Sequence, residues 1–203
     1  SVEETGGHPI VIGTDHSAGE ETPHILFYGH YDVQPPDPID LWESGPFDPF
    51  IRNHNGEKQI VARGACDDKG QFMTFVEAIR AWKKINGKMP FRTTILIEGE
   101  EEVASANMYS FLEKNKNRFE ADACIVCDTG MLGPNKPAIT SMLRGLVYLE
   151  IKYYGPDKDL HSGSYGGAVA NPLNWLSRAI GNLHDEKGKV TIDGFYDNVN
   201  DIS

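Results

Sequence analysis

The stretch ILFYGHYD, which runs from Ile25 to Asp32, sets the pattern on which the fold depends. A short apolar run leads directly into an imidazole and a carboxylate. Comparable stretches follow at Arg63–Gly70 (RGACDDKG), Ile95–Glu102 (ILIEGEEE) and Cys124–Asp128 (CIVCD). Three of the apolar runs are predicted to be buried strands. Because ligands of open α/β sheets gather beyond the carboxyl ends of the strands, we expect these ionisable groups to meet in space.

Strand and helix signals alternate along the first two thirds of the chain. An amphipathic helix is predicted to end at Gly87, followed by a strand over Arg92–Ile97 and a helix that Ser105 caps and that ends near Phe119. The apolar face of the first helix consists of Phe72, Phe75, Val76, Ile79 and Trp82. This alternation predicts an α/β fold, with a mainly parallel sheet flanked by helices.

The pattern changes near Arg144. A long strand is predicted at 146–153, in which Leu146, Tyr148, Glu150 and Lys152 alternate with Val147, Leu149, Ile151 and Tyr153. A Gly-rich turn at Ser162–Gly167 leads to Asn171-Pro172, where a helix is predicted to begin. We therefore expect two domains, a larger one over residues 1–142 and the start of a smaller α+β domain over residues 143–203.

Composition restricts the possible partners. The 203 residues are 39% hydrophobic and 24% charged, with a formal net charge of -11, which argues against nucleic acid or an anionic membrane as a partner. No apolar run reaches the roughly 18 residues of a membrane span. Three cysteines make no disulfide framework, and Cys124 and Cys127 would point to opposite faces of a strand. Buried thiols in a reducing, cytoplasmic compartment are expected.

Each ionisable group also has an ordinary structural interpretation. His30 could be a hydrogen-bonded structural histidine, with Asp32 on the same side of the extended segment. The pair Asp67-Asp68 could cap a helix, although that explains only one of the two carboxylates. The glutamates could form a solvated acidic loop. They are Glu98, Glu100, Glu101 and Glu102.

Taken together, the groups favour a metal site. A carboxylate can bridge two cations at the roughly 3.5–4 Å separation of two-metal sites, and the glutamate cluster could supply one ligand and one general base. Mixed imidazole and carboxylate ligands suit zinc, with manganese or cobalt as possible substitutes.

At these residues the sequence resembles the dinuclear metallopeptidases that include cytosolic nonspecific dipeptidase (carnosinase), aminoacylase, acetylornithine deacetylase and succinyl-diaminopimelate desuccinylase, and the dipeptidase branch most of all. The matching motifs are Gly29–Pro35 (GHYDVQP), Ala62–Gly70 (ARGACDDKG), Glu98–Glu102 (EGEEE) and Leu160–Gly163 (LHSG). The resemblance covers essentially the whole chain, which looks like the middle of a longer family member. It implies a zinc-peptidase-like catalytic domain followed by a lid or dimerisation domain.

The resemblance also implies roles. Asp67 would bridge two divalent ions, His30 and Asp128 would bind one of them, and Glu102 the other. Glu101 would be the general base and Asp32 would orient His30. The peptide bond between Asp67 and Asp68 is often cis in such proteins. His161 would belong to the lid or dimerisation domain and contact the substrate in the partner subunit's site, so a homodimer is implied; its alternative is a turn histidine.

The implied reaction is hydrolysis of the amide bond of dipeptides or short N-acyl amino acids. Two departures from the family pattern stand out. Ala104 occupies a position where glycine commonly follows the acidic cluster, and the second ion's histidine and a carboxylate-binding arginine have no candidate here. A non-catalytic metal-binding or dimerisation module is therefore the competing hypothesis. A magnesium phosphatase built on Asp67-Asp68 is weaker, since it leaves His30 and the glutamates unused.

Overall fold

The computed structural model describes residues 1–133 and 135–200. The chain forms two compact units, Ser1–Ser141 and Met142–Ser203, and each is described by itself. No helix in the described ranges is both long and apolar enough to cross a membrane.

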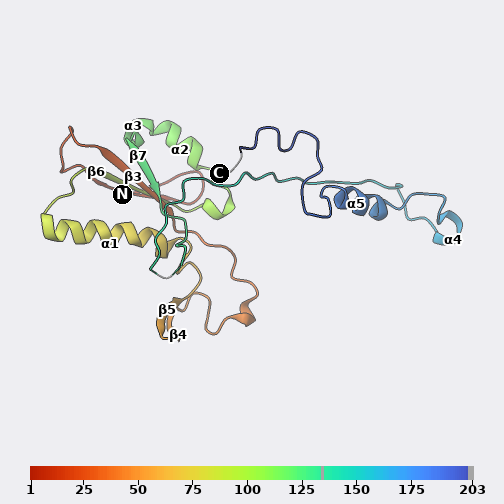
Figure 1. Cartoon of the computed structure of the whole chain (residues 1–203), viewed down its shortest axis with the longest axis horizontal. Helices are drawn as coiled ribbons and strands as arrows, with labels where there is room; N and C mark the ends of the chain where they lie inside the picture. The colour runs from red at the N-terminus through yellow and green to blue at the C-terminus, as the bar shows by residue number, and fades with distance from the viewer. Residues whose placement is uncertain (134, 201–203) are drawn as a thin grey trace. The chain divides into compact units, whose positions relative to one another are not determined.

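The first unit is built on a five-stranded sheet (Figure 1). Its strands, in spatial order, are β1 (Val2–Glu3), β2 (Ile10–Asp15), β6 (Arg92–Glu98), β3 (His24–His30) and β7 (Ala123–Val126). β3 pairs in parallel with both β6 and β7, whereas β2 is antiparallel to both β1 and β6. Four strands thus point the same way, which confirms the predicted α/β class with a mainly parallel sheet.

Helices cover both faces of this sheet. α1 (Lys69–Asn86) packs Phe75 against Phe27 and Ile97 on one face. On the other face α2 (Met108–Lys114) packs Phe111 against Leu96 and the β2 isoleucines, and α3 (Lys116–Phe119) adds Phe119. Figure 1 shows α1 on one side of the strands and α2 with α3 on the other. Successive residues of a strand point to opposite faces, so neighbours such as Leu96 and Ile97 enter different cores.

The expected end of α1 is confirmed and the expected cap of the next helix is wrong. Gly87 follows α1 with φ of 80° and donates to the Lys83 carbonyl, a conformation that glycine adopts at low cost. The residue that precedes α2 is Asn107, not Ser105. The Ser105 hydroxyl is engaged elsewhere, because it donates to the Glu98 carboxylate at 3.0 Å.

A hairpin outside the sheet was not predicted as such. β4 (Phe50–His54) pairs with β5 (Glu57–Val61), whereas the sequence had indicated only one short strand there. The signal for a hairpin was present. Asn55 and Gly56 form the turn with φ of 51° and 85°, and Asn-Gly is the dipeptide that favours such tight turns. Two single-turn elements, η1 (Ile39–Leu41) and η2 (Glu101–Val103), complete this unit.

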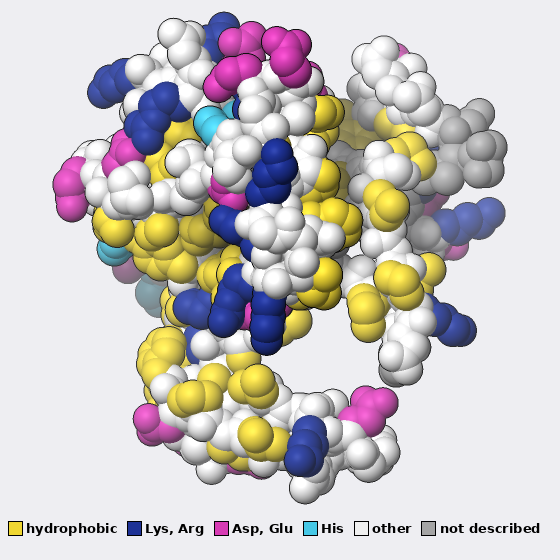
Figure 2. Space-filling model, turned by 90° about the vertical axis from the view of Figure 1, so that its left-hand side faces the viewer, with side chains coloured by type: hydrophobic (Ala, Val, Ile, Leu, Met, Phe, Trp, Pro, Cys, Tyr) yellow, Lys and Arg dark blue, Asp and Glu magenta, His cyan; other side chains and the backbone are white. Residues whose placement is uncertain are grey.

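The predicted burial of β7 and of the thiols is wrong. All four residues of β7 are exposed, because the strand lies at the edge of the sheet and is paired only with β3. Cys124 lies on this strand and is exposed, Cys66 is exposed, and Cys127 is partly buried. Many large apolar side chains of the chain are likewise exposed, and Figure 2 shows some of them in yellow.

The second unit contains α4 (Ser162–Tyr165) and α5 (Pro172–Gly181). The helix predicted to begin at Asn171-Pro172 is confirmed, with the Asn171 side chain accepting from the Leu173 N–H at 2.9 Å. The long strand predicted at 146–153 is wrong, since the structure assigns no strand to these residues. A strand must exchange hydrogen bonds with a neighbour, and the described residues pair none with this segment.

Candidate metal centre

The carboxyl ends of the three adjacent parallel strands bring the predicted groups to one edge of the sheet. β3 ends at His30, which lies opposite Glu98 at the end of β6. On the other side, Tyr28 lies opposite Val126, so Asp128 follows β7 beside the end of β3. Asp67 comes from the loop that precedes α1. Parallel pairing therefore assembles groups that are far apart in the sequence, as expected for an open α/β sheet.

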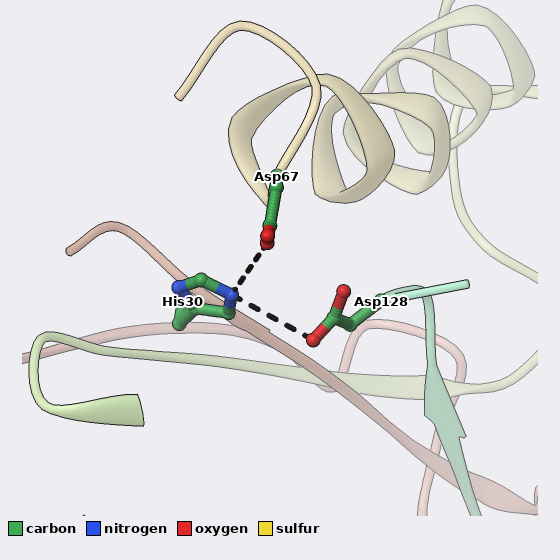
Figure 3. A group of neighbouring side chains, drawn as sticks. All are labelled: His30, Asp67 and Asp128. Carbon is green, nitrogen blue, oxygen red and sulfur yellow. Dashed lines mark hydrogen bonds and ion pairs between the residues drawn. The ribbon is translucent and has the colours of Figure 1, made fainter. Parts of the chain in front are cut away.

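His30, Asp67 and Asp128 converge on one point (Figure 3). His30 Nε2 lies 3.1 Å from Asp67 Oδ1 and 3.6 Å from Asp128 Oδ2. The three residues each offer one ligand atom, and these atoms all lie within 4.8 Å of one another. One imidazole nitrogen with two carboxylate oxygens is a donor set that zinc, manganese or cobalt accepts. The residues present thus fit a divalent cation.

The His30 imidazole is fully buried, while Asp67 and Asp128 keep 59% and 30% of their side chains exposed. Burial opposes protonation of the ring and by itself lowers the pKa of His30. The hydrogen bond to the Asp32 carbonyl and the negative charge of Glu101 outweigh it, so the pKa is raised. For Asp128, burial comes first and the neighbouring Asp67 charge adds to it, so the pKa of this carboxyl is also raised. A divalent cation would offset the repulsion between these carboxylates.

Asp32 connects the histidine to the acidic loop. His30 Nδ1 lies 3.1 Å from the Asp32 carbonyl oxygen and 3.3 Å from its carboxylate Oδ1. The same carboxylate accepts from the backbone N–H groups of Glu101, at 3.2 Å, and Glu102, at 2.9 Å. Ring orientation and loop position therefore depend on one side chain, and such partners of a ligand histidine tune its geometry.

The carboxylates of Glu101 and Glu102 make different contacts. Glu101 Oε2 is 3.8 Å from His30 Nε2, and burial, followed by the nearby carboxylates, raises the pKa of Glu101 despite the opposing effect of His30. The carboxylate of Glu102 lies outside the three-residue group and accepts from Gln34 Nε2 at 2.6 Å. Glu101 thus approaches the His30 ring, whereas the Glu102 carboxylate is bound by Gln34.

Asp68 fixes the end of β3 instead of capping α1. It is fully buried, its carboxylate accepts from the His30 backbone N–H at 2.9 Å, and it makes no capping bond to the helix. The capping hypothesis is therefore wrong for this residue. Gly29 makes the close approach possible, because a Cβ there would lie 2.7 Å from Asp68 Oδ2 and 2.8 Å from Phe72 Cβ. The peptide bond between Asp67 and Asp68 is cis.

Glu98 and Glu100 of the acidic cluster are buried and hydrogen-bonded, unlike Glu101 and Glu102, to which the family resemblance assigns functional roles. Glu98 is 3% exposed and accepts from the hydroxyls of Tyr28 and Ser105. Glu100 is 9% exposed and accepts from the backbone N–H of His8 and from Asn107. A solvated acidic loop is therefore wrong for these two.

His161 lies in the second unit. Its Nδ1 accepts from the Gly163 N–H at 3.1 Å and caps α4, which is the geometry of a turn histidine. The substrate contact implied for it stays a prediction.

Comparison with known proteins gives the site its context. The family model for peptidase family M20/M25/M40 matches residues 26–198, a range that contains every residue of the candidate centre. The chain belongs to this family. Among curated relatives of this M20 chain, the Cys-Gly metallodipeptidase DUG1 of Candida albicans is 36% identical over 195 residues, which are 94% of this chain and 39% of the relative. The human Beta-Ala-His dipeptidase is 34% identical over 196 residues, which are 94% of this chain and 37% of the relative.

A solved structure agrees. The M20 family metallo-carboxypeptidase Sso-CP2 from Sulfolobus solfataricus superposes with a TM-score of 0.75 at 36% identity, covering 100% of this chain and 45% of that one. The chain therefore spans about two fifths of the length of the curated relatives it matches.

Proposed function

We propose that this M20 chain belongs to a metal-dependent hydrolase that cleaves the amide bond of dipeptides or short N-acyl amino acids. The observation that carries the proposal is the convergence of His30, Asp67 and Asp128 within 4.8 Å, with Glu101 beside them. The names of the relatives support it, since they describe a Cys-Gly metallodipeptidase, a Beta-Ala-His dipeptidase and a metallo-carboxypeptidase.

The ligand roles proposed are those that the family resemblance implies. His30 and Asp128 would hold one divalent ion, Asp67 with its two oxygens would hold both, and Glu102 would hold the second. Zinc suits this set, and manganese or cobalt could replace it. When bound, such ions polarise a scissile carbonyl and make water a stronger acid.

Glu101 would be the general base. Its Oε2 accepts a proton from the attacking water, and the same proton is then given to the leaving amine as the C–N bond breaks. Asp32 would hold His30 and the Glu101 backbone in place throughout.

We also propose roles for the two parts of the chain. Residues 1–142 would be the catalytic metal-binding domain, and residues 143–203 would belong to a lid or dimerisation domain. His161 would contact the substrate there, in a homodimer. Crosslinking or analytical ultracentrifugation would test the dimer, and a monomer at all concentrations would refute it.

The decisive experiment replaces Glu101 by Gln, which keeps the size of the side chain and removes the base. Hydrolysis of Cys-Gly and β-Ala-His by the native and variant proteins is measured together with bound metal. We expect turnover to fall by about 10²–10⁴-fold with metal content unchanged.

His30→Ala is the matched control, and in it metal content should fall as well. Substantial turnover in Glu101→Gln would refute the base. Metal binding by the native chain with no hydrolysis would favour the non-catalytic module.

A further inference from the structure

Glu101 and Glu102 are adjacent in the chain but differ in how their side chains are held. The Asp32 carboxylate accepts hydrogen bonds from the backbone N–H groups of both. Only Glu102 is also held by its side chain, through the 2.6 Å bond from Gln34 Nε2 to Oε2. Within the described residues this is the one hydrogen bond that the Glu102 carboxylate accepts. Asp32 and Gln34 lie two residues apart, so a single segment fixes both the path of the loop and the direction of one carboxylate.

The chemical nature of Gln34 matters for a cation ligand. A primary amide is a neutral donor, so it satisfies one carboxylate oxygen without bringing a positive charge that would compete with a metal ion. The other oxygen of Glu102 stays available. A lysine in the same place would form an ion pair and reduce the negative charge that attracts a cation. Groups that hydrogen-bond to a ligand carboxylate typically change metal affinity by about 10–100-fold.

The contact also explains how adjacent glutamates can have different tasks. Glu101 Oε2 lies 3.8 Å from His30 Nε2, whereas Glu102 Oε2 accepts a hydrogen bond from Gln34. We propose that Gln34 is a positioning residue, which orients Glu102 and thereby sets the affinity for the ion that Glu102 holds, while leaving the affinity for the ion that His30 and Asp128 hold unchanged. The inference rests on the proposed function, because that function makes Glu102 a ligand.

The test compares Gln34→Met with Glu102→Gln in the full chain. Methionine has a similar length and no donor. Zn²⁺ alone is titrated into metal-free protein by calorimetry, and Co²⁺ absorption provides an independent signal for the ligand set. Glu102→Gln identifies the binding step that depends on Glu102. We expect Gln34→Met to weaken that same step by about 10–100-fold and to leave the other step and the urea midpoint of the metal-free protein unchanged.

Two further variants sharpen the result. Gln59→Met is the matched control, because the Gln59 amide contacts Arg52 in the β4–β5 hairpin, and its binding should equal the native protein's. Gln34→Lys keeps a donor and adds a charge, and it should also weaken the Glu102 step. Native-like binding in Gln34→Lys would overturn the requirement for a neutral donor.

The outcomes separate this inference from the function on which it rests. If Glu102→Gln weakens binding and Gln34→Met does not, or if Gln34→Met weakens both steps equally, the role of Gln34 is overturned and the proposed function stands. If Glu102→Gln leaves Zn²⁺ binding unchanged, or the native chain binds no Zn²⁺, the ligand assignment fails and the inference falls with it.

Discussion

The two units of this chain use similar sequence patterns with different structural results. In Ser1–Ser141 most apolar residues of β2, β3 and β6 are buried or partly buried between helices. In the second unit no described residue, up to Asn200, is buried, although residues 146–153 also contain a run of apolar side chains. Leu96 in β6 is 2% exposed and Leu149 in that run is 62% exposed. An apolar run therefore indicates that a segment can be buried, and its burial depends on other segments packing against it.

Helices and strands differ in this respect. α5 forms in the second unit because its signals are local: the Asn171 cap, Pro172 in the first turn, and hydrogen bonds within the segment itself. Residues 146–153 form no strand, because every hydrogen bond of a strand requires another segment.

Hydrogen exchange should give the largest difference between the units. Amides at the centre of β6 are expected to exchange only through global unfolding, which implies protection of about 10³-fold or more. Amides of residues 146–153 should exchange almost as fast as in an unstructured peptide. Mass spectrometry after short labelling times measures both. Equal protection of the two segments would contradict the exposure of residues 146–153.

Two leucine truncations test the same contrast energetically. Leu96→Ala should lower the free energy of unfolding by about 2–5 kcal/mol, since it leaves a cavity between β6 and α2. Leu149→Ala should change it by less than about 0.5 kcal/mol, because that side chain is exposed. Urea unfolding followed by circular dichroism gives both values. A large effect at Leu149 would show that its side chain is buried in solution.

A third comparison removes a side chain that accepts from a backbone N–H in each unit. Asp68→Ala should destabilise the first unit by about 1–3 kcal/mol, because it leaves the buried His30 N–H without its acceptor. Asp68→Asn keeps an acceptor and should retain most of the stability. Asn171→Ala removes an exposed cap and should reduce the helicity of α5 only. Chemical shifts of the two regions distinguish these results, and equal losses for Asn and Ala at position 68 would contradict the role of the acceptor.

Ion pairs give the smallest expected effect. Arg118 donates to both Glu3 oxygens, at 2.6 and 2.7 Å, and lowers the pKa of Glu3 to about 2. Because the folded pKa lies below the ordinary value of 4.5, the pair stabilises the fold above that value and loses its effect as the pH falls through about 2. In Arg118→Met, the pKa of Glu3 should rise toward its ordinary value in an NMR pH series, although the Ser1 hydroxyl still lowers it.

The pair Lys152–Glu150 in the second unit is the control for the effect of an ion pair on stability. Its nitrogen–oxygen distance is 3.2 Å and both side chains are more than half exposed. Lys152→Met should leave stability unchanged, since exposed pairs contribute little. An unaltered Glu3 titration in Arg118→Met would contradict the first assignment.

The sequence predicted the α/β class with a mainly parallel sheet and the meeting of His30 and Asp128, because the carboxyl ends of parallel strands share one edge of the sheet. Asp67 reaches the same place from the loop before α1. The residues alone could not separate Glu98 and Glu100 from Glu101 and Glu102, which only the family resemblance singled out, since their burial depends on Tyr28, Asn107 and other partners distant in the chain. Nor could they place Asp68, whose carboxylate turns toward β3. Ala104 adopts φ of 71°, a conformation that favours glycine. Its departure from the family pattern therefore costs about 1 kcal/mol of backbone strain.

The His30 ring is completely buried and the Asp67 and Asp128 carboxylates are partly exposed, so an approaching ion meets the carboxylates first. Before any ion is bound, the charge of these acids attracts cations and repels anions. A bound cation would offset that charge, so a negatively charged substrate group would be attracted more strongly to the metal-loaded site than to the empty one.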